Sequence, residues 1–119
     1  MAFSQRDVVT IKDSNTDGTK NDGRLARFVV MSSKDYNSNS KSLLACPLTG
    51  SKDNRFNVRC GVRLVQEHME GGTIEECFAR FDTLTTLSQD RILRIIGKVH
   101  VIWYKELITK ANDFIRVQA

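Results

Sequence analysis

The amino-acid sequence predicts a mainly β fold, a small and strongly bent barrel with helices toward its C-terminal end. Three observations favour it: short apolar or alternating segments recur along the chain, polar loops separate them, and an amphipathic stripe follows near the C-terminus. The chain has 119 residues, of which 40% are hydrophobic and 27% are charged, a composition typical of a globular protein with one modest core. We therefore expect a single domain over residues 1–119.

The first half of the chain is expected to form strands joined by long polar loops. In four segments apolar residues dominate or alternate with polar ones, and we interpret them as strands: 7–11, 26–32, 42–48 and 56–65. Residues 12–23 are polar and turn-forming, and residues 33–41 are rich in Ser, Asn and Lys, so both are expected to be loops. In segment 56–65 the alternation would place Arg59 and Arg63 on one polar face.

The second half is expected to combine further strands with two helices. A turn at Gly71 and Gly72 precedes a strand candidate over residues 73–82. Residues 85–96 predict a short helix with Ser88 as its N-cap and Gly97 after its end, and residues 98–103 predict another strand. In the last segment, 104–117, apolar residues recur with helical spacing and predict one amphipathic helix: Leu107, Ile108, Ala111, Phe114 and Ile115.

Positive charge is concentrated in the first half of the chain. Residues 1–60 contain ten Lys or Arg and six Asp or Glu, whereas residues 61–119 contain eight of each, so the formal charge of +4 arises entirely in the first half. This uneven charge favours an anionic partner, nucleic acid first. The apolar runs are too short to span a membrane and no hydrophobic signal region is apparent, so we expect a cytoplasmic protein without membrane contact.

The cysteines and histidines do not indicate a metal site. Cys46, Cys60 and Cys77 include no Cys-x-x-Cys pair, so buried, reduced thiols in apolar strand-like surroundings are the favoured interpretation. His68 lies in a glycine-flanked stretch and His100 in an apolar strand candidate, and neither has neighbours arranged as a catalytic triad. We predict no metal and no cofactor.

Candidate chemistry gathers at the expected strand ends. Arg80 and Asp82 are two residues apart, so in extended chain both point to one face, where the arginine can stabilise charge and the carboxylate can accept a proton. A solvated salt bridge is the alternative interpretation of this pair. Thr49 and Ser51 flank a glycine and form either a plain turn or an anion cradle. Arg27 lies at the start of the second strand.

Short motifs follow one another along the chain: Arg27-Phe28-Val29-Val30, Tyr36-Asn37, Cys46-Pro47-Leu48-Thr49-Gly50-Ser51, Arg80-Phe81-Asp82-Thr83-Leu84-Thr85 and Ile96-Gly97-Lys98-Val99. In this order they resemble the MazF/PemK family of bacterial endoribonuclease toxins, over most of the chain. The family has an Arg-Pro followed by an apolar strand, a Pro-Val-Thr-Ser, and in its PemK-type branch an Arg-Cys-Asp-Gln-Pro-Arg. Here Phe28 replaces the first proline, and Thr83 and Thr85 replace the glutamine and the second arginine. The resemblance implies an SH3-like, CcdB/PemK-type β-barrel with a short helix and a C-terminal amphipathic α-helix.

The resemblance also implies a function, the toxin of a type II toxin–antitoxin system. Such a toxin is a sequence-specific, metal-independent endoribonuclease that cleaves single-stranded RNA by attack of a ribose 2′-hydroxyl and leaves a 2′,3′-cyclic phosphate. Asp82 would be the general base, Arg80 the acid or the group that stabilises the phosphorane charge, and Arg27 and Thr49 would bind or polarise the scissile phosphate. A cognate antitoxin and a second copy of the chain are the implied protein partners. Basic, polar and aromatic residues would line the RNA path: Lys20, Arg24, Ser51, Lys52, Arg55 and Phe56.

Two other functions are compatible with the sequence. A gyrase-directed toxin of the same fold, similar to CcdB, would act through a hydrophobic helix tip, and the segment from Phe114 to Ala119 lacks the terminal aromatic residue expected for it. A catalytically silent SH3-like module would bind nucleic acid or protein, with Arg59 and Arg63 as its natural binding face.

Overall fold

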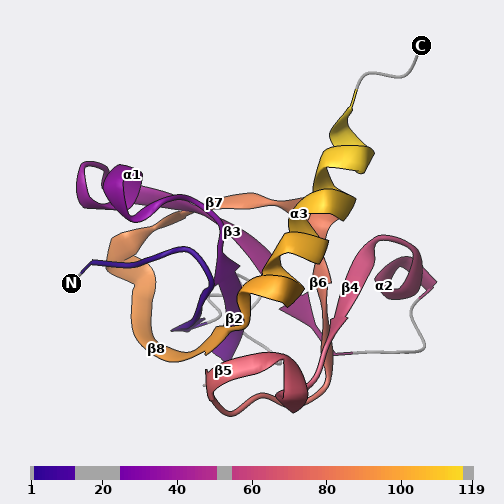
Figure 1. The fold of residues 1–119 in the computed structure, drawn as a ribbon. Coiled ribbons are helices and arrows are strands. Elements are labelled where there is room, and N and C mark those ends of the chain that lie inside the picture. The colour runs from indigo at the N-terminus through magenta and orange to yellow at the C-terminus, as the bar shows by residue number, and fades with distance from the viewer. Residues whose placement is uncertain (1, 13–24, 51–54, 117–119) are drawn as a thin grey trace, which may run out of the picture.

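The strands and helices are seen in a computed structural model, which describes residues 2–12, 25–50 and 55–116 (Figure 1). Within these ranges the elements follow in chain order: β1 (Asp7–Lys12), β2 (Leu25–Val30), α1 (Lys34–Ser38), β3 (Ser42–Thr49), α2 (Arg55–Arg59), β4 (Gly61–Leu64), the 3₁₀ turn η1 (Gln66–His68), β5 (Met69–Gly72), β6 (Cys77–Arg80), the 3₁₀ turn η2 (Phe81–Thr83), β7 (Thr85–Ser88), the 3₁₀ turn η3 (Gln89–Arg91), β8 (Ile92–Val99) and α3 (Val101–Ile115).

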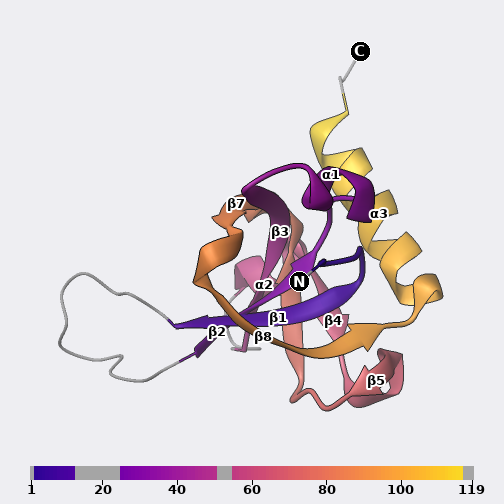
Figure 2. The same ribbon diagram turned by 90° about the vertical axis from the view of Figure 1, so that its left-hand side faces the viewer.

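The strands form one sheet in the order β4-β6-β3-β2-β1-β8-β5, and β7 joins it by pairing with β3. All pairings of the described strands are antiparallel. On its side away from β2, β3 changes partner: residues 42–45 pair with β7 and residues 48–49 pair with β6. The sheet curls into a half-barrel, and α3 follows at its end (Figure 2). The mainly β, bent-barrel fold with a C-terminal helix is therefore confirmed.

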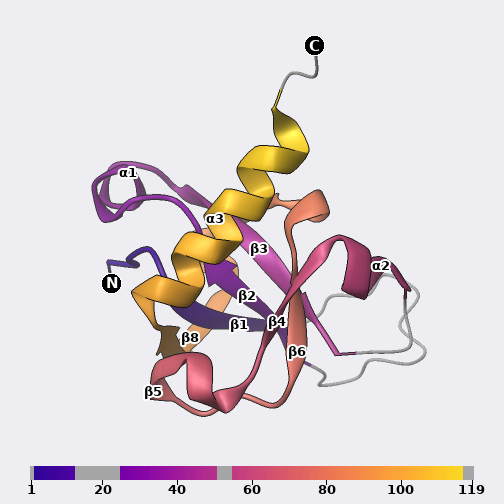
Figure 3. The same cartoon turned by 45° about the vertical axis from the view of Figure 1, so that its right-hand side comes forward.

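Each face of the curled sheet carries its own hydrophobic core, because neighbouring residues of a strand point to opposite faces. Val8 and Val29 belong to the core that α3 covers, and we call this side the helix-side face. Val9 and Val30 belong to a second core on the opposite face, together with Phe3. Figure 3 shows α3 lying across the helix-side face. Helix residues that enter the first core recur at helical spacing: Trp103, Tyr104, Leu107 and Ala111.

The C-terminal amphipathic helix is confirmed, and it starts at Val101, earlier than predicted. The side chain of Trp103 donates a hydrogen bond to the carbonyl of Arg63 at 2.8 Å, and the hydroxyl of Tyr104 donates one to the carbonyl of Met31 at 3.0 Å. These two bonds tie the first turns of α3 to β4 and to Met31, the residue that follows β2. The predicted strand over 98–103 is wrong beyond Val99, because His100 is already the N-cap of the helix.

The short helix predicted over residues 85–96 is wrong. This segment forms β7, the turn η3 and most of β8. Leu87 pairs with Leu43 of β3 and is buried, whereas its neighbours Thr86 and Ser88 are exposed, which is the burial of a strand. In β8 the pairing with β1 shifts twice, so that Leu93 and Ile96 are extra residues opposite β1. Such bulges break the two-residue period and leave an apolar spacing that resembles a helix.

The strand predicted over residues 56–65 is correct only in its last part. Residues Arg55–Arg59 form the helix α2, and the strand β4 begins at Gly61. The apolar residues of the supposed alternation, Phe56 and Val58, are exposed, and Asn57 between them is buried. Arg59 and Arg63 therefore lie in different elements and do not form one stripe on a strand.

Three smaller predictions also change. The strand expected over 73–82 is confined to β6, and Gly71 and Gly72 end strand β5 instead of forming a separate turn. The loop expected over 33–41 contains the helix α1, whose N-cap Ser33 accepts a hydrogen bond from the Tyr36 backbone. The loop expected over 12–23 lies outside the described residues except for Lys12, which ends β1.

The cysteines are free thiols, as expected: Cys46 and Cys77 are buried, and Cys60 is half-buried after the end of α2. Burial raises the pKa of the Cys46 thiol to about 12 and that of Cys77 to about 11, so both stay protonated at neutral pH. Along the stretches that the structure describes, no helix is long and apolar enough to cross a membrane.

Candidate active site

The predicted pair Arg80 and Asp82 forms a two-point ion pair. Arg80 Nε donates to Asp82 Oδ1 and Arg80 Nη2 to Asp82 Oδ2, both at 2.8 Å. Arg80 ends β6 and Asp82 lies in the turn η2. The side chains therefore meet because the chain turns tightly between them, whereas their spacing in the sequence predicts an extended strand. Their side chains are only 15% and 17% exposed. A partly buried pair in this fixed geometry is stronger than an ordinary surface salt bridge.

Asn57 connects this pair to Thr49. The amide oxygen of Asn57 accepts a hydrogen bond from Thr49 Oγ1 at 2.7 Å and another from Arg80 Nη1 at 3.0 Å. The Asn57 residue is 1% exposed. Four elements thus converge on one polar cluster, which we call the Arg80 cluster and which consists of Thr49, Asn57, Arg80 and Asp82. The sequence reasoning missed Asn57, since it placed this residue on the outer face of a strand.

Gly61 allows α2 to carry Asn57 onto the strands. Gly61 is the β4 residue that pairs with Arg80, and a Cβ atom there would overlap the backbone carbonyl oxygen of Asn57. The end of α2 is fixed by a hydrogen bond from the Cys60 amide to the Phe56 carbonyl at 2.8 Å. The Cys60 carbonyl in turn accepts from the Phe81 amide at 3.1 Å, so α2 and η2 are held together.

Phe56 of α2 covers one side of the cluster. The guanidinium carbon of Arg80 lies 5.9 Å from the centre of the Phe56 ring, within the range of a cation–π contact. Phe56 is nevertheless 54% exposed, and Arg55 beside it is also exposed. Phe56 is thus the predicted RNA-binding residue that contacts the cluster, and Arg55 precedes it at the start of α2. The other four, Lys20, Arg24, Ser51 and Lys52, lie outside the described residues.

The ion pair sets the charge state of both partners. The hydrogen bonds from Arg80 hold the pKa of Asp82 below its usual value, and the same bonds raise the pKa of Arg80. Asp82 is therefore a carboxylate, and Arg80 a full cation, across the neutral pH range. A carboxylate can accept a proton, and a fixed guanidinium can stabilise negative charge that develops on oxygen.

Arg27 lies outside this cluster. It pairs with Leu48 across β2 and β3, so its side chain shares the helix-side face with Leu48, whereas Thr49 and Arg80 alternate to the opposite face. Within the described part of the chain its guanidinium forms no hydrogen bond or ion pair. Arg27 and Thr49 nevertheless lie on neighbouring strands near the same end of the sheet. The structure thus brings together three of the four predicted catalytic residues and places the fourth one strand away.

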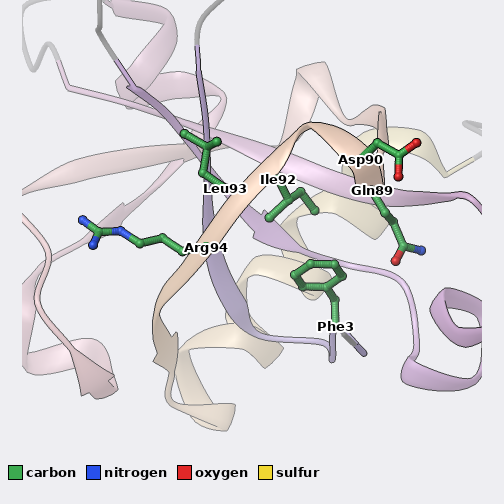
Figure 4. Close-up of a pocket in the computed structure, with 6 residues that line it drawn as sticks. All are labelled: Phe3, Gln89, Asp90, Ile92, Leu93 and Arg94. Carbon is green, nitrogen blue, oxygen red and sulfur yellow. The ribbon is translucent and has the colours of Figure 1, made fainter.

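Two further features of the described residues bear on the search for a site. They include no group of three or more His, Cys, Asp or Glu that could hold a metal ion. A pocket of about 260 Å³ lies against β8 and the N-terminal segment, lined by residues that include Phe3, Gln89 and Ile92 (Figure 4). None of the predicted catalytic residues lines this pocket.

The sequence matches the family of PemK-like, MazF-like toxins of type II toxin–antitoxin systems over residues 4–114. Since the match extends over nearly the whole chain, the protein belongs to this family. No curated protein sequence is similar enough to this chain to count as a match.

Solved structures show the same fold at low sequence identity. A MazE–MazF complex from Deinococcus radiodurans is 16% identical, with a TM-score of 0.75, and the match covers 99% of this chain and 100% of that one. An endoribonuclease in complex with its cognate antitoxin from a mycobacterial species is 13% identical, with a TM-score of 0.73, covering 99% and 97%. The toxin MazF-mt6 of Mycobacterium tuberculosis is 10% identical, with a TM-score of 0.70, covering 96% and 100%.

Proposed function

We propose that this protein is the endoribonuclease toxin of a type II toxin–antitoxin system. It cleaves single-stranded messenger RNA at particular sequences, without a metal ion, and acts as one domain over residues 1–119 in the cytoplasm. The observation that carries the proposal is the Arg80 cluster, in which a carboxylate, a guanidinium and a hydroxyl lie together. The chain that contains this cluster belongs to a family of toxins. Endoribonuclease activity is also the stated function of a protein with the same fold.

The reaction that fits this cluster is an internal transfer at phosphorus. Asp82 accepts the proton of a ribose 2′-hydroxyl as that oxygen attacks the adjacent phosphorus. The bond from phosphorus to the 5′-oxygen of the next nucleotide breaks, that oxygen takes a proton from solvent, and a 2′,3′-cyclic phosphate remains. Arg80 stabilises the phosphorane charge. This role suits Arg80 better than proton donation, because its raised pKa makes the guanidinium keep its proton.

Thr49 and Arg27 are proposed to hold the scissile phosphate at the end of the sheet. The Thr49 hydroxyl donates to Asn57 within the cluster, so it can turn to a phosphate oxygen while Arg80 keeps Asn57 in place. Arg27 lies on the neighbouring strand β2, and its guanidinium forms no hydrogen bond or ion pair with the described residues. The RNA path continues over Arg55 and Phe56, and the sequence adds Lys20, Arg24, Ser51 and Lys52 to it.

The proposed protein partners are a cognate antitoxin and a second copy of this chain. The antitoxin is suggested by the family and by solved complexes of the same fold. A homodimer is supported by large apolar side chains that are exposed in the described part of the chain, on β8 and at both ends of α3: Leu93, Ile95, Val101, Ile102, Phe114 and Ile115. Light scattering of the purified protein measures this association directly.

RNA cleavage in the presence of EDTA tests the function. We expect purified protein to cut a long mixed-sequence single-stranded RNA in EDTA and to leave 2′,3′-cyclic phosphate ends, which are identified by their resistance to a phosphatase until acid opens the ring. Asp82→Ala and Arg80→Ala should each lose most of the activity. Circular dichroism and thermal unfolding show whether these variants remain folded.

A second ion pair provides the matched control. Arg63 and Glu76 also form an arginine–carboxylate pair, but their side chains are 59% and 42% exposed. Arg63→Ala and Glu76→Ala should therefore cleave RNA as the unaltered protein does. Intact RNA after incubation with the unaltered protein, under conditions where it binds the RNA, would support the catalytically silent module instead. Inhibition of DNA gyrase supercoiling without RNA cleavage would support the CcdB-like alternative.

A further inference from the structure

An aromatic pair joins the turn η2, which carries Asp82, to the end of α3. The rings of Phe81 and Phe114 meet edge to face, with their centres 5.7 Å apart and their planes at 68°. This geometry is favourable, because the positive edge of one ring faces the negative surface of the other. Phe81 directly precedes Asp82, and Phe114 lies in the last turn of the helix. The end of α3 therefore contacts the turn that carries the carboxylate.

Phe81 and Asp82 are neighbours in η2, but their side chains enter different surroundings. Phe81 is 8% exposed and belongs to the core of the helix-side face. Asp82 instead accepts two hydrogen bonds from Arg80 within the Arg80 cluster. Because both residues share one short turn, a rotation of Phe81 in the core would also move the backbone that carries Asp82. The two-point contact with Arg80 tolerates little such movement, since both oxygens must stay within hydrogen-bond distance.

Phe114 extends the buried stripe of α3 as far as this turn. It follows Leu107 and Ala111 at a spacing that keeps the three residues on one face of the helix. Leu107 and Ala111 are buried in the helix-side core, whereas all residues in 112–116 are exposed. Figure 3 shows the C-terminal half of α3 beside the segment that follows β6, and the helix contacts η2 there. Although Phe114 is 54% exposed, its ring is thus in contact with the site's own turn.

Hydrogen bonds hold η2 at its two ends. The Phe81 amide donates to the Cys60 carbonyl at 3.1 Å, and the Thr83 hydroxyl donates to the Arg80 carbonyl at 3.3 Å. The second bond is long for a hydroxyl donor and is therefore weak. The packing around Phe81 supplies further support for the turn, and Phe114 completes that packing on the side of the helix.

We propose that Phe114 is a positioning residue for the RNA cleavage described above. Its ring holds Phe81, and through η2 it holds the Asp82 carboxylate in the orientation in which Arg80 binds both oxygens. The inference rests on the proposed function, and it adds to the site a residue of the C-terminal helix that acts through the turn and not on RNA itself.

The kinetics of RNA cleavage test this role. With a labelled single-stranded RNA that the unaltered protein cleaves, Phe114→Ala should lower kcat about tenfold and leave KM nearly unchanged. A misplaced carboxylate slows proton abstraction, whereas the groups that hold RNA are unaltered. Rates are measured well below the melting temperature of each variant, so that all of the protein is folded. Phe114→Tyr keeps the ring, and its added hydroxyl can reach solvent, so this variant should retain the unaltered kcat.

Ile115→Ala is the matched control. Ile115 is the next residue of α3, is 67% exposed and belongs to the same exposed apolar end of the helix as Phe114. Its removal would therefore weaken any association between two copies of the chain through this end. We expect Ile115→Ala to cleave RNA with the kcat of the unaltered protein. Equal losses of kcat in Ile115→Ala and Phe114→Ala would overturn the positioning role, because the helix end would then act as a whole.

The titration of the Asp82 carboxyl group provides a readout that does not depend on RNA. The carboxyl ¹³C signal, followed by NMR from about pH 7 to about pH 2, gives the pKa of Asp82 in each variant. Phe114→Ala should loosen the hydrogen bonds from Arg80 and raise the pKa of Asp82 toward the usual value for an aspartate, about 3.9. In Ile115→Ala and Phe114→Tyr this pKa should keep its lowered value.

The outcomes separate this role from the proposed function. If the unaltered protein cleaves RNA but Phe114→Ala has an unchanged kcat, the positioning role is wrong and the function stands. A lower kcat with an unchanged pKa of Asp82 overturns the role as well, because Phe114 would then act elsewhere. If the unaltered protein does not cleave RNA, the proposed function fails, and a pKa of Asp82 that rises in Phe114→Ala alone still shows that Phe114 holds this carboxylate.

Discussion

At the scale of single residues, the state of Asp82 decides what the site can do. Both carboxylate oxygens accept hydrogen bonds from Arg80, which makes Asp82 fully ionised but a weaker base than a free carboxylate. The same bonds hold the carboxylate in one orientation. In the proposed reaction, a phosphate that drew Arg80 partly away would return basicity to Asp82.

This ion pair predicts a pH dependence of stability. Because the pKa of Asp82 is lowered in the folded state, the pair stabilises the fold above the ordinary pKa of an aspartate, about 3.9, and the effect is lost as the pH falls through the lowered value. The free energy of unfolding should differ between the unaltered protein and Asp82→Asn by a constant amount from pH 7 to about 5, and the difference should shrink below pH 4. Urea unfolding at a series of pH values measures it. A difference that already shrinks between pH 7 and 5 contradicts the lowered pKa.

Asn57 predicts a second effect at this scale. Asn57→Ala leaves the Thr49 hydroxyl and one Arg80 nitrogen without their common acceptor in a buried place. The free energy of unfolding should fall by about 1–3 kcal/mol, and RNA cleavage should fall with it because Arg80 loses one of its supports. Asn39→Ala, at an exposed asparagine that ends α1, is the control and should change stability by less than about 0.5 kcal/mol.

At the scale of secondary-structure elements, the sequence predicts regular segments well and irregular ones poorly. Clean apolar patterns predict β1, β2, β3 and α3 close to their observed bounds. The sequence of β8 predicts a helix, because two bulges shift the register of this strand against β1 and break its two-residue period. The sequence of α2 predicts a strand, because apolar Phe56 and Val58 alternate with Asn57. In the structure the two apolar side chains are exposed and the asparagine is buried, the opposite of what their polarity suggests.

The candidate site shows the same division. Thr49, Arg80 and Asp82 stand in short motifs, so their sequence positions could be singled out, and the structure brings these three together. Asn57 could not be found, because its importance arises from the way α2 folds back over Gly61.

Two glycines offer a test of how α2 is positioned. Gly61→Ala should displace α2, because the new methyl group meets the rigid backbone carbonyl of Asn57. We expect a loss of about 1–3 kcal/mol in the free energy of unfolding and a clear loss of RNA cleavage. Gly71→Ala, at a site with no atom within 4 Å of the added group, should leave cleavage unchanged. Equal effects of the two changes would argue against this role of Gly61.

At the scale of the whole molecule, the distribution of charge predicts how RNA lies. The excess of +4 belongs to the first half of the chain, which also contains Arg27, Thr49 and the residues proposed for the RNA path. Replacing Lys20, Arg24, Lys52 and Arg55 together by Gln should lower the slope of log K against log salt by about 3, if each contacts one phosphate of a single strand. Fluorescence anisotropy at several salt concentrations measures the slope, with a single-stranded oligonucleotide whose 2′-O-methyl groups prevent cleavage by 2′-hydroxyl attack. Replacing Lys34, Lys41, Lys105 and Lys110 by Gln is the control of equal charge, and an equal drop in slope would show that only net charge matters.

The change of partner along β3 has a consequence for how the molecule opens. One half of this strand pairs with β7 beside the second core, and the other half pairs with β6 beside the Arg80 cluster, with Pro47, which has no N–H group, near the change. The strand cannot detach from β6 alone without loosening its hold on β2, which contributes to both cores. Its amide hydrogens should therefore exchange with solvent only when the entire protein unfolds, whereas those of the short helix α2 can exchange through local fluctuations. The strands below the Arg80 cluster and the two cores then form one cooperative unit, and α2 with Phe56 is the part beside the cluster that can move without global unfolding.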